Sequence, residues 1–204
     1  VNKWHTCPNS GPINASNPCS EYMFIDDSAC NLASLNLLKF RKEDGSFDVE
    51  KFKHAVRIFI IAQEILVDNG SYPEPTIAEN SHKFRPLGLG YANLGSLLMS
   101  MALPYDSDHG RAWANAITAV LTGTAYAVSA EISHVKGPFE EFEKNREEML
   151  NVISMHREHA CQIPEVHCVD YMLNAAKDSW EQAFSAGQKY GYRNAQATVL
   201  APTG

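Results

Sequence analysis

Three side chains with different chemistries alternate in the stretch "NPCSE", which runs from Asn17 to Glu21. If this stretch is extended, Asn17, Cys19 and Glu21 point to the same side, because alternate residues of an extended segment share a face. A carboxylate can then act as a general base, an amide can bind a hydroxyl, and the thiol between them can be a nucleophile, a proton source or a hydrogen-atom donor. The alternative is a buried cysteine in a turn whose asparagine and glutamate are solvated.

A second thiol, Cys30, follows Cys19 by eleven positions, within the small and polar stretch "SACNLAS". Two neighbouring thiols suggest redox exchange, although a free cysteine is more often packed as a small apolar side chain. Neither cysteine has a CxxC partner, and the total of five cysteines is odd. With no visible secretory signal, we expect reduced thiols in the cytoplasm.

A group of potential metal ligands lies near the C-terminal third, and it comprises His156, His159, Cys161, His167 and Cys168. The spacing fits a zinc site poorly, since there is no CxxC pair. We therefore expect no metal here, and assign these side chains to surface and capping roles.

Two other stretches suggest nucleotide binding only weakly. In "GLGYANLG", the third glycine of a dinucleotide fingerprint is replaced by Asn93, and close packing of a helix explains the glycines better. The last stretch, "TVLAPTG", is a strand that leads into Pro202, Thr203 and Gly204. A strand followed by a small-residue loop is a common phosphate cradle.

The composition excludes some classes of partner. The net charge is -7 and there is no run of Lys or Arg, which argues against a nucleic-acid duplex. No apolar stretch approaches the roughly 18 residues that span a bilayer. Apolar residues make up 45% of the 204 residues, which is enough for a substantial core.

The elements that must position these residues are mostly helices. Residues 1–20 are predicted to be loop, 21–25 a strand, and 26–40 a strand or a short helix. Asp48 is expected to cap a helix over 49–68 that ends at Asn69-Gly70. Further helices are predicted within 80–106 (with Pro86 in the first turn), from after Asp106 to Lys136, over 143–162 and over 169–190, with a buried strand at 194–201. Large helical insertions between strands of a bigger α/β barrel would give this order, and so would an all-α domain with short strands.

Four stretches together resemble one family. "NPCSE", "SACNLASLNL", "RPLGLGYANLGSLLM" and "GYRNAQATVLAPTG", in this order, resemble the catalytic barrel of ribonucleotide reductase large chains, most nearly the adenosylcobalamin-dependent class II enzymes. The resemblance implies an α/β fold, a helix-rich fragment of a ten-stranded α/β barrel. Residues 1–204 would be one partial domain, with a finger loop at about 15–26, a helical block at about 49–190, and a terminal strand and phosphate loop at about 194–204.

The resemblance also implies roles for the residues of the first motif. Cys19 would become the transient thiyl radical that takes the 3′ hydrogen of the ribonucleotide. Glu21 would accept the proton of the 3′-hydroxyl, and Asn17 would hydrogen-bond the substrate hydroxyls. Cys30 would be one half of the dithiol that reduces the 2′ carbon, and no residue clearly matches the other half, because Cys7 is too close in sequence.

Substrate contacts are implied at both ends of the chain. Pro18 and Ser20 would complete the substrate-facing part of the finger loop. Pro202, Thr203 and Gly204 would begin the loop that holds the substrate phosphates.

The implied enzyme is a ribonucleoside-diphosphate reductase, an oxidoreductase that uses adenosylcobalamin to make deoxyribonucleotides for DNA synthesis. Its partners would be a ribonucleotide, a thioredoxin-type or glutaredoxin-type reductant, the remainder of the reductase chain and, in a homodimer, a second copy. We expect the isolated chain to be inactive. Three alternatives remain: a class I large subunit with a diiron partner, a non-catalytic helical docking fragment, and a metal-binding module that depends on Cys161 or Cys168.

Overall fold

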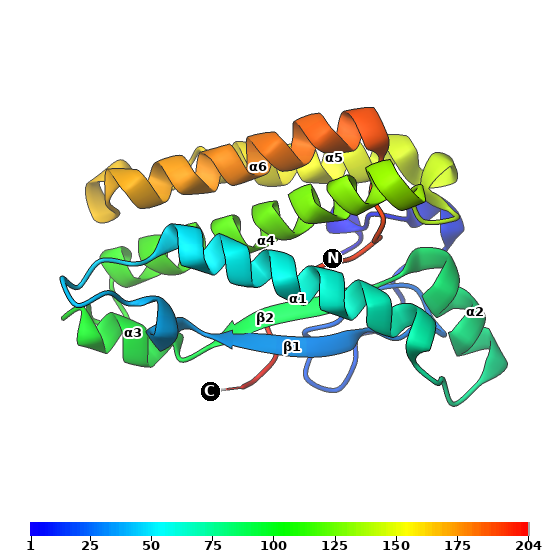
Figure 1. The fold of residues 1–204 in the computed structure, drawn as a ribbon, viewed down its shortest axis with the longest axis horizontal. Coiled ribbons are helices and arrows are strands. Elements are labelled where there is room, and N and C mark those ends of the chain that lie inside the picture. The colour runs from blue at the N-terminus through cyan, green and yellow to red at the C-terminus, as the bar shows by residue number, and fades with distance from the viewer. Residues whose placement is uncertain (204) are drawn as a thin grey trace.

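The computed structural model describes residues 1–203, in which helices cover a small parallel sheet. A layer of α4, α5 and α6 lies above the strands, α1 runs across them, and α2 and α3 stand at opposite ends (Figure 1). The bounds are β1 Asn31–Asn36, α1 Val49–Asn69, α2 Pro75–Phe84, β2 Leu87–Ala92, α3 Leu94–Ser100, α4 Asp108–Lys136, α5 Phe142–Ala160 and α6 Asp170–Tyr190. None of the helices within residues 1–203 combines the length and the apolar character needed to cross a membrane.

The sheet is parallel, which fits an α/β architecture. β1 pairs with β2 from Asn31 opposite Leu87 onward, and Leu89 of β2 forms a further parallel bridge with Thr198. The strand predicted at 194–201 is thus reduced to this one bridge, and we call the extended segment around it the C-terminal strand. Helices fill the connections between these three segments, as parallel strands require a long crossover. The order of helices and strands therefore comes from helical crossovers, and the all-α alternative is wrong.

The single helix predicted within 80–106 is wrong. The structure has the end of α2, then β2, then the short α3 in that range. Arg85, with φ of 50°, ends α2 in the left-handed region, and the chain then extends. The glycines serve strand packing, since a Cβ on Gly90 would collide with the carbonyl oxygen of Val199 on the neighbouring segment. The strand predicted at 21–25 is also absent, and Phe24 and Ile25 are instead buried in irregular backbone.

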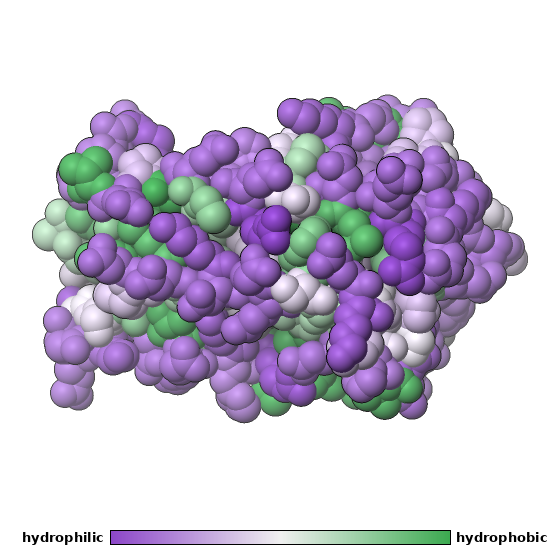
Figure 2. All heavy atoms as spheres, turned by 90° about the horizontal axis from the view of Figure 1, so that it is seen from above, coloured by the Kyte–Doolittle hydropathy of each residue, from purple (hydrophilic) through white to green (hydrophobic). Residues whose placement is uncertain are grey.

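The other helices follow their predicted limits closely. Asp48 caps α1, since its Oδ1 accepts a hydrogen bond from the Lys51 N–H at 3.1 Å. The long α4 begins after Asp106 and ends at Lys136 before Gly137, as predicted, and Ser107 caps its start. α4 packs along α6 in the core. Seen from above, the outer face of the upper helical layer carries mainly hydrophilic side chains with small hydrophobic groups between them (Figure 2), as expected for amphipathic helices.

A buried ionic network joins α1 to the two strands that follow. Glu64 of α1 accepts hydrogen bonds from Arg85 Nε at 2.6 Å, Arg193 Nε at 2.8 Å and Asn194 Nδ2 at 2.6 Å. Ser129 of α4 completes it, because its hydroxyl donates to Asn194 Oδ1 at 2.8 Å and accepts from the Asn194 N–H at 3.0 Å. Arg85 and Glu64 are only 5% and 7% exposed. The network fixes the starts of β2 and of the C-terminal strand relative to α1.

Candidate active site

The stretch "NPCSE" forms a tight turn and is not extended. The Ser20 N–H donates to the Asn17 carbonyl oxygen at 3.0 Å, which makes Pro18 and Cys19 the central residues of a β-turn. Ser20 follows in the left-handed region with φ of 63°. Alternation along a strand therefore cannot be what brings these side chains to one side.

Asn17 and Tyr22 close the base of this loop. The Tyr22 N–H donates to Asn17 Oδ1 at 3.0 Å, and the Asn17 N–H donates to the Tyr22 carbonyl oxygen at 3.2 Å. The amide oxygen of Asn17 is thus used inside the loop. Its Nδ2 makes no hydrogen bond with any other residue of the described chain, and is free to donate to a bound molecule.

The side chains of the loop differ in their exposure. Cys19 is exposed at the turn and forms no disulfide with any described cysteine. Glu21 is half-buried, and its Oε2 is covered but has no hydrogen-bond partner among residues 1–203. Buried polar atoms are normally paired, so this carboxylate oxygen is an acceptor still to be satisfied.

Cys30 lies half-buried next to the N-terminal end of β1 and within the electrostatic reach of Glu21. Burial raises the pKa of the Cys30 thiol to about 12, and the Glu21 carboxylate adds to the rise. At neutral pH the side chain is therefore a thiol and not a thiolate. Such a group can deliver hydrogen or a proton, but it is a poor metal ligand and a poor nucleophile.

Tyr22 is a residue that sequence reasoning missed. Its hydroxyl is 2.9 Å from the Ser28 hydroxyl, and Ser28 donates to the Ile25 carbonyl oxygen at 2.6 Å. Burial raises the pKa of Tyr22 well above its ordinary range, and the thiols of Cys30 and Cys7 contribute to the rise. The phenol therefore stands in the same neighbourhood as both thiols. Cys7 itself is fully buried.

The proposed phosphate turn lies at the C-terminal edge of the sheet. Pro202 and Thr203 are exposed, and Gly204 lies outside the described residues. The Thr203 N–H donates to the Ala201 carbonyl oxygen at 2.8 Å, and its hydroxyl donates to the Tyr91 carbonyl oxygen at 3.3 Å. Pro202 has no N–H, so these two residues present no free backbone donor to a phosphate.

The loop and the C-terminal turn lie on one side of the sheet. In Figure 1 the blue loop after the N-terminal turns hangs below the two strands, on the side where the red C-terminal segment also ends, away from α4, α5 and α6. This side carries no helix of the layer above. Both segments therefore lie on the side of the sheet that faces away from the helical layer.

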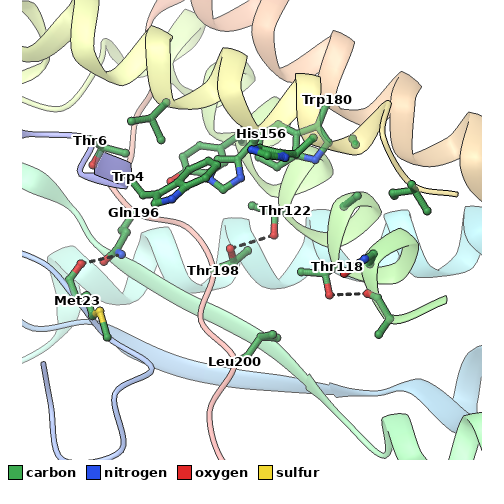
Figure 3. Close-up of a pocket in the computed structure, with 18 of the residues that line it drawn as sticks. Trp4, Thr6, Met23, Thr118, Thr122, His156, Trp180, Gln196, Thr198 and Leu200 are labelled. Carbon is green, nitrogen blue, oxygen red and sulfur yellow. Dashed lines mark hydrogen bonds between the residues drawn. The ribbon is translucent and has the colours of Figure 1, made fainter. Parts of the chain in front are cut away.

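The large cavity of about 820 Å³ is on the other side of the C-terminal strand, between it and α4 and α5. Met23, Gln196 and Thr198 line it, together with the ring of His156, which stacks on Trp180 (Figure 3). The predicted catalytic residues are absent from its lining. We call residues 17–25 the thiol loop. The cavity contacts its base at Met23 and Phe24 and not its tip at Cys19.

The histidines and cysteines of the C-terminal third are dispersed. Cys161 is exposed and Cys168 is buried, while His156 is part of the aromatic stack. Within residues 1–203 no group of three or more His, Cys, Asp or Glu side chains could hold a metal ion. The structure thus offers nothing in support of the metal-binding alternative.

Comparison with known proteins decides the family. The sequence matches the family described as ribonucleotide reductase, barrel domain, over residues 1–204. The chain belongs to this family. The resemblance seen in its four motifs is thereby confirmed.

Individual proteins similar to this chain are also named ribonucleotide reductases. The chain is 59% identical over its full length to a vitamin B12-dependent ribonucleotide reductase of Rhodopirellula baltica and 50% identical to one of Agrobacterium fabrum. A vitamin B12-dependent ribonucleoside-diphosphate reductase of Mycobacterium tuberculosis is 28% identical over 72% of the chain. The chain spans 20%, 17% and 21% of the lengths of these three proteins.

Proposed function

We propose that residues 1–204 form part of the catalytic barrel of an adenosylcobalamin-dependent ribonucleotide reductase. The whole enzyme would convert ribonucleotides, expected to be diphosphates, into 2′-deoxyribonucleotides. The observation that carries the proposal is the arrangement around the loop: an exposed thiol at a turn, a carboxylate oxygen without a partner two residues later, and a protonated thiol nearby. The names of the relatives support the same chemistry.

Each residue of the loop has a proposed task. Cys19 loses its thiol hydrogen and, as a thiyl radical, takes the 3′ hydrogen of the ribose. Glu21 accepts the 3′-hydroxyl proton at Oε2, which has no partner among the described residues. Asn17 donates from Nδ2 to a substrate hydroxyl, since its Oδ1 is bonded to Tyr22. Cys30 supplies reducing equivalents to the 2′ carbon from the protonated thiol that its raised pKa maintains.

The residues present fit adenosylcobalamin as the source of the radical. Cys19 is exposed among residues 1–203, so it is accessible to a group bound by the remainder of the reductase. When bound, adenosylcobalamin supplies a carbon-centred radical by homolysis of its Co–C bond. Cys19 is the residue of this chain that would face it.

The proposed whole protein is larger than this chain. We place the three parallel segments in a ten-stranded α/β barrel, with residues 15–26 as its finger loop and Pro202 to Gly204 at the start of its phosphate loop. A second reductive cysteine would come from the remainder of the reductase chain, because Cys7 is fully buried. A thioredoxin-type or glutaredoxin-type reductant and a second copy of the chain are the proposed partners, and the isolated chain is proposed to be inactive.

The test uses the full-length reductase that contains residues 1–204. It is incubated with adenosylcobalamin tritiated at the 5′ position, together with reductant and effector, and tritium is measured in water. Cys19→Ala removes the proposed radical thiol, and Cys161→Ala is the matched control at an exposed cysteine outside the loop. Cys30→Ala should keep the exchange and lose net deoxyribonucleotide formation.

Washout that disappears in Cys19→Ala and persists in Cys161→Ala is the expected result. Equal washout in wild type, Cys19→Ala and Cys161→Ala would refute the role of Cys19. Reduction that needs an added diiron subunit, without any washout, would move the protein to class I.

A further inference from the structure

One side chain links the thiol loop to the C-terminal strand. Gln196 lies on that strand six positions before Pro202, and its Nε2 donates to the carbonyl oxygen of Met23 at 3.2 Å (Figure 3). Met23 comes two residues after Glu21. The bond spans 173 positions of sequence, so it connects two parts of the proposed site that the local chain does not.

The strand is a rigid support for this side chain. The Gln196 carbonyl oxygen accepts from the Leu87 N–H at 2.8 Å, and the Ala197 carbonyl oxygen accepts from the Leu89 N–H at 3.1 Å. On the far side, the Thr198 hydroxyl lies 3.2 Å from the Thr122 hydroxyl of α4. Because both the sheet and α4 hold this segment, the backbone that carries Gln196 is anchored on two sides.

The loop has no comparable anchor of its own. The bonds between Asn17 and Tyr22, and between Tyr22 and Ser28, are local and shape the loop without placing it. Phe24 is buried against Phe84, which holds the stem by packing. Among residues 1–203, two hydrogen bonds from distant elements reach the finger loop 15–26. Gln196 donates to Met23 inside it, and Asn80 of α2 donates to the Asp26 carbonyl oxygen at its end, at 3.4 Å.

The orientation of the amide follows from its neighbour. Only the NH₂ end of Gln196 can face the Met23 carbonyl oxygen, so Oε1 points away, and it is covered without a partner in the described part of the chain. A buried polar atom without a partner is costly, and an apolar side chain of the same length would avoid that cost. The polar side chain is therefore explained by its single bond to the loop and not by packing.

We propose that Gln196 is a positioning residue, which holds the loop of Cys19 and Glu21 at a fixed place relative to the strand that leads to the phosphate turn. It acts through the Met23 carbonyl and touches no reacting atom. The expected effect on catalysis rests on the proposed function, in which Cys19 and Glu21 react with the substrate. A misplacement of about 1 Å in a reacting group can lower a rate about 100-fold.

The test compares Gln196→Met and Gln196→Glu with wild type in the full-length reductase. Gln196→Met keeps the length and loses the donor, and we expect kcat to fall between about 10- and 100-fold while KM changes less than about twofold, because uniform substrate binding is retained. Gln162→Met is the control, since Gln162 lines the same cavity and its side chain makes no hydrogen bond with residues 1–203.

Gln196→Glu adds another measurement, the pH dependence of kcat, which would not change if Gln196 had only a structural role. Its carboxylate repels the Met23 carbonyl oxygen at neutral pH, but a protonated carboxyl can donate as the amide does. The kcat of this variant relative to wild type should rise as the pH falls toward the ordinary pKa of glutamate, about 4.3, while the ratio for Gln196→Met stays flat. A Gln196→Glu ratio that is still flat at that pH, or a wild-type kcat in Gln196→Met, would overturn the inference.

A second measurement needs no activity. If the loop loses its anchor, Glu21 moves away from Cys30 and the thiol becomes easier to ionise, so Cys30 in Gln196→Met should react several-fold faster with iodoacetamide. An unchanged rate would count against the anchor. If wild type and Cys19→Ala do not differ in tritium washout, the proposed function fails, and this labelling rate still decides whether Gln196 holds the loop.

Discussion

Replacing Glu64 by glutamine should show how strongly the buried ionic network holds the fold. The change removes one negative charge that faces the guanidinium groups of Arg85 and Arg193 at 2.6 and 2.8 Å. Breaking a buried ion pair at one partner costs about 3–5 kcal/mol, because the other charge stays buried. Glutamine keeps one acceptor oxygen, so we expect about 3 kcal/mol, the lower end of that range.

The assay is urea unfolding of the chain at pH 7, followed by circular dichroism and tryptophan fluorescence, with free energies from the midpoint and the slope. The matched control is Asp68→Asn, which removes the other carboxylate bonded to Arg85. Since the Asp68 side chain is 57% exposed, its loss should cost no more than about 1 kcal/mol. If Glu64→Gln costs less than about 1 kcal/mol, or no more than the control, Glu64 does not hold the buried arginines.

Three further predictions concern ionisation and packing. Glu21→Gln removes a charge that raises the pKa of Cys30, so Cys30 should be alkylated faster at pH 8, as measured by peptide mass spectrometry; equal rates would contradict their proximity. Burial lowers the pKa of His156 from 6.5 to about 4, so the folded state holds the neutral ring while the unfolded state binds a proton below pH 6.5. The free energy of unfolding should therefore fall by up to about 3 kcal/mol as the pH drops from 6.5 toward 4. Urea midpoints should therefore fall less for His156→Phe than for wild type between pH 7 and 4.5. Gly90→Ala should destabilise by about 1–3 kcal/mol because its Cβ meets strand backbone, whereas Gly95→Ala, in a helix with 3.8 Å to the nearest side-chain atom, should be neutral or slightly stabilising in the same unfolding assay.

Much of the helical framework could be predicted because its signals are local. The cap at Asp48, the stop at Gly137 and the end before Gly191 lie within a turn of the elements they bound. β2 could not be predicted in the same way. Gly90 is explained by the approach of Val199, which lies more than a hundred positions later, and Gly88 by the approach of Leu32 on β1. Nothing near these glycines in the sequence distinguishes strand packing from helix packing.

The candidate site was predictable in its residue types but not in its geometry. Cys19, Glu21 and Cys30 stand out because thiols are scarce, because Cys19 and Glu21 alternate in one short stretch, and because the motifs resemble a known family. The β-turn that presents Cys19 depends on hydrogen bonds of Asn17 that alternation does not foresee. Gln196 and Glu64 look like ordinary polar residues in sequence, since their partners are 173 and up to 130 positions away.

The distance in sequence between Met23 and its anchor has a consequence for synthesis of the chain. Ribosomes add about 5–20 residues per second, so the 173 positions between Met23 and Gln196 take roughly 10 to 35 s. During that time Cys19 is already made, but the strand that fixes its loop is not. The hydrogen bond to the thiol loop can therefore form only after Gln196 has been made, and a chain that stalls before Gln196 carries Cys19 on a loop that lacks this bond.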